Sequence, residues 1–491
     1  MVKHLHVPPG AALAEIYAAW AAGLTTAGIP AVVRERAVEA LTDHLGLVVS
    51  ARREDYVRAA LSGWDGRGDC TAFGHAGGFD MAGAALINGT AAHGEDYDDT
   101  FEGSPVHTSA AVIPAVLAAA EHHGADGQAV LRGIVAGAEL MCRMAIVAPT
   151  AQHRAGCQPT AVAGAMGAAA GVAVTLGMTA REITDALGIA GSFASGIIEY
   201  LAEGTWTKRI HPGWAAQSGI RAALLARGGF RGPRTVFEGE HGFFFAFGVS
   251  SITPDFTRLT EGLGTHWHFA NIAFKPYACG TMVQPFIDCA IRLSRDGVAV
   301  EDIASILCRV GEGTVHRLWE PLSEKRRPST PYSAKFSVPF GVAVGLVDRA
   351  AGLNQFTEER IADPMILSLA ARIGYEIDPD DEYPRNYSGT VIATLKDGRV
   401  IEARQPHLRG GVHERLTMDE IAAKFAANCR YGGWSETQGE TLRKVAADLF
   451  EADDLAAISS MVSRSWTPPR RCGWRASITR PSFSVAITVP E

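Results

Sequence analysis

The chain has 491 residues, of which 47% are hydrophobic and 20% are charged, and this composition is typical of a folded protein with a large core. The net charge of −8 argues against a general attraction to nucleic acid or to an anionic membrane. The eight cysteines form neither a Cys-x-x-Cys pair nor a Cys/His cluster with zinc spacing, which favours reduced thiols in a cytoplasmic protein. Two prolines and Glu15 interrupt the N-terminal apolar stretch, so we expect no secretory signal.

The first 260 residues are predicted to be helical, because small and apolar residues recur at helical spacing. The clearest such segments are 29–49, 81–92, 109–123, 128–147, 160–176 and 212–228. Thr179 and Glu182 form a capping-box pattern at the start of a further helix, which we expect to end at Gly191.

Residues 155–180 carry no charge and contain Gly167 and Gly171, a Gly-x-x-x-Gly spacing that is used by packed membrane helices. The stretch consists mostly of Ala and Gly, which contribute little to membrane insertion. We therefore predict a buried helix in close contact with its neighbours, and no membrane span.

Runs of β-branched residues begin only after about residue 270. Residues 304–310 read ASILCRV, and residues 389–395 read GTVIATL, which KDGR and then VIEAR follow. Two alternating strands around Asp-Gly predict a hairpin. Because the strand signals are confined to this segment, we expect its strands to pair only with one another and not with residues 1–260.

A second capping-box pattern, Thr417 with Glu420, then indicates a return to helix. The predicted fold class is mainly α, with a large all-helical domain and an inserted, smaller α+β lid domain. The helical domain would comprise residues 1–269 and 409–462, and the lid would comprise residues 270–408. Residues 463–491 contain Pro-Pro and five arginines and show no helical period, so we expect an irregular tail.

Polar stretches interrupt this apolar background at 93–109, 153–160, 203–213, 274–285 and 331–340. Buried polar groups are costly unless they have partners, so we expect these stretches to line one shared polar cavity. The first reads HGEDYDDTFEGSPVHTS and holds five carboxylates and two histidines. Its acids could instead only cap helix ends and form salt bridges. No GxGxxG, Walker A or GxSxG sequence points to a nucleotide or to a hydrolase elbow.

Together these stretches resemble the MmgE/PrpD family. The resemblance is carried by NGTAAHGEDYDDT at 88–100, by His107 before TSAAVIPAVLA, by TKRIHPGWAAQSG at 207–219, by KPYACGTMVQPFIDCA at 275–290, and by YSAKFSVPFGVAVGLV at 332–347. It runs from about residue 12 to 460. It implies an enzyme that uses no metal and no organic cofactor, that acts on a small di- or tricarboxylate, and that forms a homodimer.

The resemblance implies three catalytic residues, Asp96, His107 and Lys208. His107 precedes an apolar helix, whose N-terminus favours a neutral imidazole that accepts a proton near pH 7. Lys208 would stabilise charge that develops on a substrate carboxylate, unless it only forms a surface salt bridge. The residues expected to bind substrate are Gln158, Arg209, Lys275, Tyr277, Gln284 and Lys335.

Gln158 and Gln284 occupy positions where the family commonly carries histidine, and glutamine cannot exchange protons near pH 7. His153 and His211 are further candidates for a missing proton carrier. We expect α-proton abstraction and elimination of water, as in a 2-methylcitrate dehydratase. The alternatives are an epimerase like iminodisuccinate epimerase, a decarboxylase like cis-aconitate decarboxylase, and a catalytically silent carboxylate-binding protein. The acids at 95–102 would also suit a divalent cation, but they lack EF-hand spacing, and we expect no metal.

Overall fold

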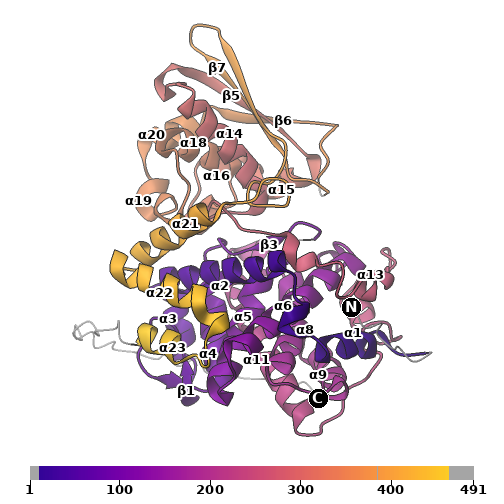
Figure 1. Ribbon diagram of the computed structural model, residues 1–491. Coiled ribbons are helices and arrows are strands. Elements are labelled where there is room, and N and C mark those ends of the chain that lie inside the picture. Colours follow the sequence, from indigo (N-terminus) through magenta and orange to yellow (C-terminus); the bar gives the residue numbers. More distant parts are fainter. Residues whose placement is uncertain (1–9, 105, 384, 464–491) are drawn as a thin grey trace, which may run out of the picture.

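The computed structural model describes residues 10–463 except Pro105 and Pro384. It has a helical body and a smaller part that holds the main sheet (Figure 1). The predicted class, mainly α, is confirmed. The predicted tail lies outside the described residues from position 464 onward.

The body is built from the first thirteen helices and from three that follow the sheet. The first group is α1 (Leu13–Ala22), α2 (Ala31–Ala51), α3 (Asp55–Ser62), α4 (Met81–His93), α5 (Thr108–His123), α6 (Gly127–Val147), α7 (Ala151–Arg154), α8 (Pro159–Thr175), α9 (Ala180–Phe193), α10 (Tyr200–Glu203), α11 (Thr207–Arg227), α12 (Phe243–Ala246) and α13 (Thr257–Thr260). The second is α21 (Met418–Tyr431), α22 (Glu436–Asp448) and α23 (Ala456–Ser463). Helix α21 begins with the predicted capping box and packs against α2.

Small residues let the body helices approach one another closely. A Cβ at Gly167 on α8 would lie 2.8 Å from the Gly137 oxygen of α6, and one at Gly171 would lie 2.9 Å from the Gly133 oxygen. Helix α8 is buried along its whole length. The prediction of a buried helix is therefore confirmed, and within the described chain no helix is long and apolar enough to cross a membrane.

Helix α9 begins with the predicted capping box, but it does not end at Gly191. It continues to Phe193. A Cβ at Gly191 would lie 2.5 Å from a methyl group of Val236. This glycine is therefore needed for close packing inside the helix, and its predicted role as a stop signal is wrong.

The main sheet has four strands in the order β6-β5-β7-β8. They are β5 (Ile303–Val310), β6 (Ile373–Ile377), β7 (Gly389–Leu395) and β8 (Val400–Gln405). Strands β5 and β6 are parallel, whereas β7 is antiparallel to both β5 and β8. The predicted hairpin is therefore confirmed as β7 and β8.

Seven helices accompany this sheet (Figure 1): α14 (Gln284–Arg295), α15 (Val315–Leu318), α16 (Leu322–Arg326), α17 (Pro331–Ala334), α18 (Val338–Asp348), α19 (Glu358–Ile361) and α20 (Pro364–Ala370). Helix α14 packs against β7, β8 and α18. In Figure 1 this part lies above the helical body, with α21 between them. That it forms a separate lid stays a prediction.

Two short strand pairs differ from the sequence prediction. Strands β1 (Arg67–Thr71) and β2 (Gly78–Phe79) pair within the segment that was expected to be helical, where Gly74 and Gly77 adopt positive φ angles that a helix does not allow. Strand β3 (Thr100–Phe101) pairs with β4 (Ile272–Ala273). The expectation that no strand joins residues 270–408 to residues 1–260 is therefore wrong, and the contact lies within the acidic stretch 93–109.

Candidate active site

The end of α4 and the start of α11 hold the centre of the site together. A Cβ at Gly89 would lie 2.7 Å from the Gly213 Cα atom, so the two helices touch backbone to backbone. Four residues beyond Gly89, α4 ends at His93. Five residues before Gly213, Lys208 stands in the first turn of α11. The small residues in both helices thus bring the acidic stretch that follows α4 to the cations of α11.

Asp96 lies between two lysines from different polar stretches. Its carboxylate pairs with Lys208 Nζ on one oxygen and with Lys275 Nζ, at 2.7 Å, on the other. Lys275 also donates to the Asp96 carbonyl oxygen at 2.9 Å. Asp96 has a φ of 57°, a left-handed conformation that is uncommon for non-glycine residues and that often marks functional sites.

The other polar stretches reach the same segment. Lys335 Nζ lies 2.5 Å from the Glu95 carboxylate and 2.7 Å from the Glu95 carbonyl oxygen. The backbone N–H of His107 donates to Thr160 Oγ1 at 3.0 Å. All five polar stretches that the sequence singles out therefore meet around residues 95–107, as expected for one shared site.

Burial and charge decide the ionisation of this cluster. Burial would raise the pKa of Asp96, but Lys208 and Lys275 outweigh it and hold this pKa well below its usual range. Burial would lower the pKa of Lys208, but Asp96 raises it above the ordinary lysine value. Asp96 is therefore ionised and Lys208 is protonated at neutral pH. Lys208 does not form the surface salt bridge that was the alternative, because its partner Asp96 is buried.

The remaining acids of the stretch have separate roles. Asp99 caps α5, because its carboxylate accepts from Thr108 N, Thr108 Oγ1 and Ser109 N at 3.1, 2.8 and 3.1 Å. Burial, followed by the charge of Asp98, raises the pKa of Asp99 to about 6. Asp98 accepts from His93 Nδ1 at 2.7 Å. The capping and pairing alternative is thus correct for Asp99, and each acid has its own partners.

His107 stands at the N-cap position of α5 and is 8% exposed. Its Nδ1 atom lies 2.6 Å from the Asp99 carbonyl oxygen. Burial lowers the pKa of His107 to about 3, Asp98 opposes this shift, and Lys275 reinforces it. The expected neutral imidazole therefore follows mainly from burial, and not from the helix N-terminus that the sequence suggested.

Arg209 contacts two aromatic rings. Its guanidinium carbon lies 4.4 Å from the ring centroid of Tyr56 and 4.4 Å from that of Tyr332. Its Nε atom is buried without a hydrogen-bond partner in the described chain. Tyr332 belongs to one of the five polar stretches, so Arg209 stays a candidate anion ligand next to Lys208.

Tyr277, Gln158 and Gln284 have local partners. The Tyr277 hydroxyl donates to Asp288 at 2.6 Å. Gln158 caps α8 by accepting from Ala161 N at 2.6 Å. Gln284 Nε2 approaches the Cys279 carbonyl at 3.4 Å, and its buried Oε1 has no partner among the described residues. Among the described residues, no hydrogen bond or ion pair joins these three side chains to Asp96 or to His107, so their substrate contacts stay predictions.

His93, Glu95 and Lys424 were not predicted from the sequence to be site residues. Lys424, on α21, pairs with Asp43 at 2.7 Å and donates to the Tyr97 carbonyl oxygen at 2.7 Å. It thereby ties the returning helix to the acidic stretch. His93 and Glu95 were visible as polar members of the same motif, whereas nothing around Lys424 in the sequence separates it from a surface lysine.

Two groups of side chains in the described chain have spacing that could hold a metal ion. They are Asp69, Cys70 and His122, and the buried group His93, Asp98 and His107. In the buried group, both Nδ1 atoms already face oxygen acceptors at hydrogen-bonding distance. A metal ion that bound through these two Nδ1 atoms would have to displace both protons.

A pocket of about 480 Å³ lies next to the cationic end of the cluster. Thr207 and His211, which flank Lys208 on α11, line it together with Tyr200 and Trp214. His211 is 8% exposed, and its Nδ1 atom has no partner in the described chain. The pocket gives a small molecule a way to approach this end of α11.

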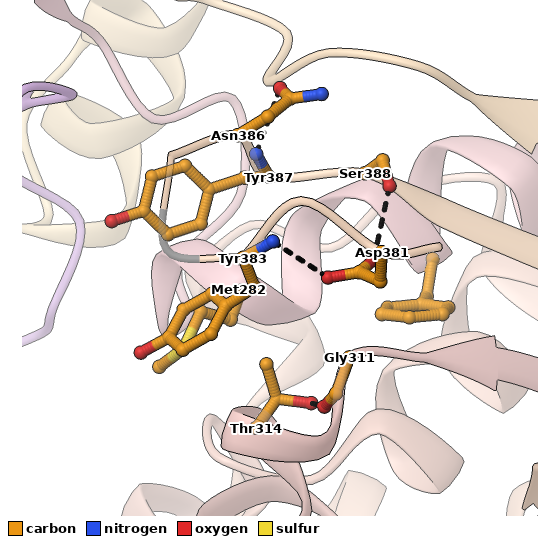
Figure 2. A pocket seen from close by; sticks show the side chains of 9 residues that line it. Met282, Gly311, Thr314, Asp381, Tyr383, Asn386, Tyr387 and Ser388 are labelled. Atoms are coloured by element: carbon orange, nitrogen blue, oxygen red, sulfur yellow. Dashed lines mark hydrogen bonds between the residues drawn. The ribbon is translucent and has the colours of Figure 1, made fainter. Parts of the chain in front are cut away.

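A second pocket lies in the sheet-containing part and is shown in Figure 2. It encloses only about 10 Å³, which is roughly the space for one water molecule. The Asp381 carboxylate that faces it already accepts from Ser388 Oγ and Tyr383 N. It contains none of the converging lysines or histidines, so it is not the candidate active site.

We expect Asp96→Asn to lower the free energy of unfolding at pH 7 by about 3 kcal/mol, because two buried lysines lose their carboxylate. The pKa of Asp96 is lower in the folded than in the unfolded state. Its contribution is therefore complete above the ordinary aspartate value of about 4 and is lost as pH falls below it. Urea unfolding of both proteins should show the same difference in the free energy of unfolding at pH 7 and at pH 5, and a smaller difference at pH 3.5.

The matched control for this prediction is Asp255→Asn, which removes an exposed aspartate that pairs with Arg258. It should unfold like the wild type at all three pH values. Equal stability of Asp96→Asn and wild type at pH 7 would contradict a stabilising role for the buried pair.

The chain is similar to known proteins along most of its length. Residues 15–253 match the family MmgE/PrpD N-terminal domain, and residues 277–449 match the family MmgE/PrpD C-terminal domain. A cis-aconitate decarboxylase from Aspergillus terreus (strain NIH 2624 / FGSC A1156) is 30% identical over 472 residues, which cover 90% of this chain and 94% of that relative. Cis-aconitate decarboxylases from Homo sapiens and Mus musculus are 27% and 26% identical, and they cover 79% and 77% of this chain and 80% and 78% of their own lengths.

Proposed function

The chain belongs to the MmgE/PrpD family, and we propose that it is a cofactor-independent lyase that acts on a small di- or tricarboxylate. It removes a proton next to a carboxylate and then eliminates water. The similarity to carbon–carbon lyases supports the general class, because named relatives along most of the chain are decarboxylases. The proposal of dehydration depends on the protonation state of His107.

One contact carries this proposal. His107 Nδ1 lies 2.6 Å from the Asp99 carbonyl oxygen, and a carbonyl oxygen can only accept a hydrogen bond. The proton of a neutral His107 is therefore on Nδ1, and the lone pair is on Nε2. Because burial lowers the pKa of His107 to about 3, the side chain enters the reaction as a proton acceptor and not as a donor.

The neighbouring charges support an anionic substrate. Lys208 and Lys275 share the single carboxylate of Asp96, so this group keeps one positive charge in excess. A substrate carboxylate would be attracted to it, and the ammonium groups would stabilise the negative charge that develops when the α-proton leaves. Lys208 is the more accessible of the two, with a side chain that is 12% exposed against 1% for Lys275.

The reaction is balanced without a further reagent. The C–H bond next to the substrate carboxylate breaks, its proton moves to His107 Nε2, and its electron pair forms the new carbon–carbon double bond as the C–O bond breaks. The leaving hydroxyl group takes the proton back from His107 and departs as water. The imidazole is then neutral again.

Decarboxylation is the second candidate, and the names of the relatives favour it. In that reaction the substrate loses carbon dioxide, and one of its carbons must gain a proton. Gln158 and Gln284 cannot donate a proton near pH 7, so the donor would have to be another group, such as Lys208, His211 or a protonated His107. An epimerase would instead return the proton to the other face of the same carbon, and a silent binding protein would do neither.

The test is NMR of the purified protein in D2O with hydroxy-dicarboxylates, hydroxy-tricarboxylates, imino-dicarboxylates and cis-aconitate. We expect alkene signals with loss of a hydroxy acid, at the same rate after exhaustive chelation. Deuterium at Cα without loss of substrate would indicate an epimerase instead, and carbon dioxide from cis-aconitate would indicate a decarboxylase. Binding without any of these changes would overturn the enzyme proposal.

We also propose a homodimer and a cytoplasmic location. The first is supported by the family and the second by the cysteine pattern of the sequence. Light scattering of the purified protein at micromolar concentration tests the first, with a mass of twice 52.0 kDa expected.

A further inference from the structure

Asp98 is placed differently from the acids on either side of it. Its Oδ2 atom lies 2.7 Å from His93 Nδ1 and 3.6 Å from His107 Nδ1. The two imidazole rings lie edge to face, with their centroids 4.9 Å apart. Asp98 thus faces both imidazoles. It approaches His107, which we propose as the base, at Nδ1 and leaves Nε2 available for the substrate proton.

The charge of Asp98 is not neutralised by other donors. Asp96 has two lysines, and Asp99 has three donors at the start of α5. The second oxygen of Asp98, Oδ1, is buried and has no hydrogen-bond partner in the described chain. Asp98 itself is 1% exposed, so water does not screen the charge from its neighbours.

We propose that Asp98, held in place by His93, is the positioning counter-ion that stabilises the imidazolium formed when His107 takes the substrate proton. This inference rests on the proposed function of His107 as the base. Asp98 does not take the proton: the C–H bond breaks, the proton goes to His107 Nε2, and the carboxylate of Asp98 stays ionised.

The need for such a counter-ion follows from the surroundings of His107. Burial and the charge of Lys275 both disfavour a protonated His107, and Lys208 acts in the same direction. Asp98 opposes these effects, and its own pKa stays below the usual range because His107 and His93 outweigh the effect of burial. Without Asp98, a positive imidazolium would form next to ammonium groups in a site of low polarity.

Other charged or titratable groups face this pair from the neighbouring elements. They are Asp96, Lys208 and Lys275 in the cation cluster, Asp99 at α5, Asp43 and His44 on α2, and Lys424 on α21. Asp43 and Lys424 neutralise each other at 2.7 Å. Asp96 is already shared by two lysines, so Asp98 is left as the acid nearest to His107.

The geometry of His93 suits a residue that positions Asp98, and not a second base. A carboxylate accepts, so the proton of His93 lies on Nδ1 and points to Asp98. Its other nitrogen, Nε2, is buried and has no hydrogen-bond partner among the described residues, so Asp98 is the only hydrogen-bond partner found for this ring in that part of the chain. The last turn of α4, in which His93 stands, fixes the position of the ring.

The test is Asp98→Asn, which keeps an oxygen acceptor for His93 and removes the charge. We expect kcat for the substrate identified in D2O to fall at least 10-fold, with KM changed less than 3-fold, because the lysines that bind carboxylate are untouched. The matched control is Asp69→Asn, since Asp69 accepts from His122 Nδ1 at 2.8 Å in an exposed pair. It should leave both kcat and KM at the wild-type values.

Two substitutions of His93 make the inference testable even if Asp98→Asn does not fold. His93→Gln can still donate to Asp98 and should keep kcat within about 3-fold of wild type, whereas His93→Leu cannot and should lower it at least 10-fold. Wild-type kcat in Asp98→Asn or in His93→Leu would overturn this inference alone. A wild type without turnover of any acid would refute the proposed function, and this inference with it.

Discussion

Replacing His107 by glutamine should lower kcat by about 10²-fold or more, which is the usual effect of losing a positioned acid–base group. The glutamine amide can replace the hydrogen bond from Nδ1 to the Asp99 carbonyl oxygen, and the backbone N–H that donates to Thr160 is unchanged. The protein should therefore fold normally, and KM should change little. Steady-state kinetics and thermal unfolding of the purified variant test both expectations.

The matched control for this change is His122→Gln, because His122 has a carboxylate partner but lies on the surface. It should have wild-type kinetics. Unchanged kcat in His107→Gln would mean that another group moves the proton. His211 would be the first alternative, since it lines the pocket next to Lys208. His153 is a weaker one, because its ring is in contact with Arg317 at 2.8 Å.

The body helices and the hairpin could be predicted because their signals are local. Apolar periodicity, capping boxes and an Asp-Gly turn each act over a few residues. The convergence of the polar stretches could also be predicted. Buried polar groups need polar partners, and the five stretches can supply these partners to one another. The contacts of Asp96 with Lys208 and Lys275 are the result.

Other features depend on tertiary contacts that no short stretch of sequence reveals. Gly191 matches a helix stop, but contact with Val236 makes it an interior residue. Lys424 looks like any lysine on an amphipathic helix until α21 is packed on α2, where it meets Asp43. The pairing of β3 with β4 joins segments more than 170 residues apart, and two residues per strand are too few to leave a strand pattern.

The individual roles of the acids could not be predicted for a related reason. Asp96, Asp98 and Asp99 are the same residue type within four positions, so composition and spacing treat them alike. Their partners come from α11, from α4 and from the start of α5. The backbone turn at Asp96, with its positive φ, separates the side chains and lets one stretch bind lysines, hold histidines and cap a helix.

Replacing Lys208 by methionine should remove almost all activity, with kcat lower by about 10³-fold, because the charge that stabilises the developing carbanion is lost. Methionine keeps a long, unbranched side chain that is only one atom shorter than that of lysine. Asp96 keeps Lys275 as a partner at 2.7 Å, so no carboxylate is left unpaired and the fold should survive. Lys208→Arg should retain part of the activity, because it keeps the charge but changes its geometry.

The matched control is Lys424→Met, which also removes a buried lysine from a carboxylate, Asp43, at 2.7 Å. It should cost stability, because Asp43 is then unpaired, but it should lower kcat far less than Lys208→Met does. A loss of activity that only followed the loss of stability in both variants would contradict a specific role for Lys208. Full activity in Lys208→Met would exclude Lys208 from the site. The anion anchor of this motif would then be Arg209, whose guanidinium carbon lies 4.4 Å from the ring centroids of both Tyr56 and Tyr332.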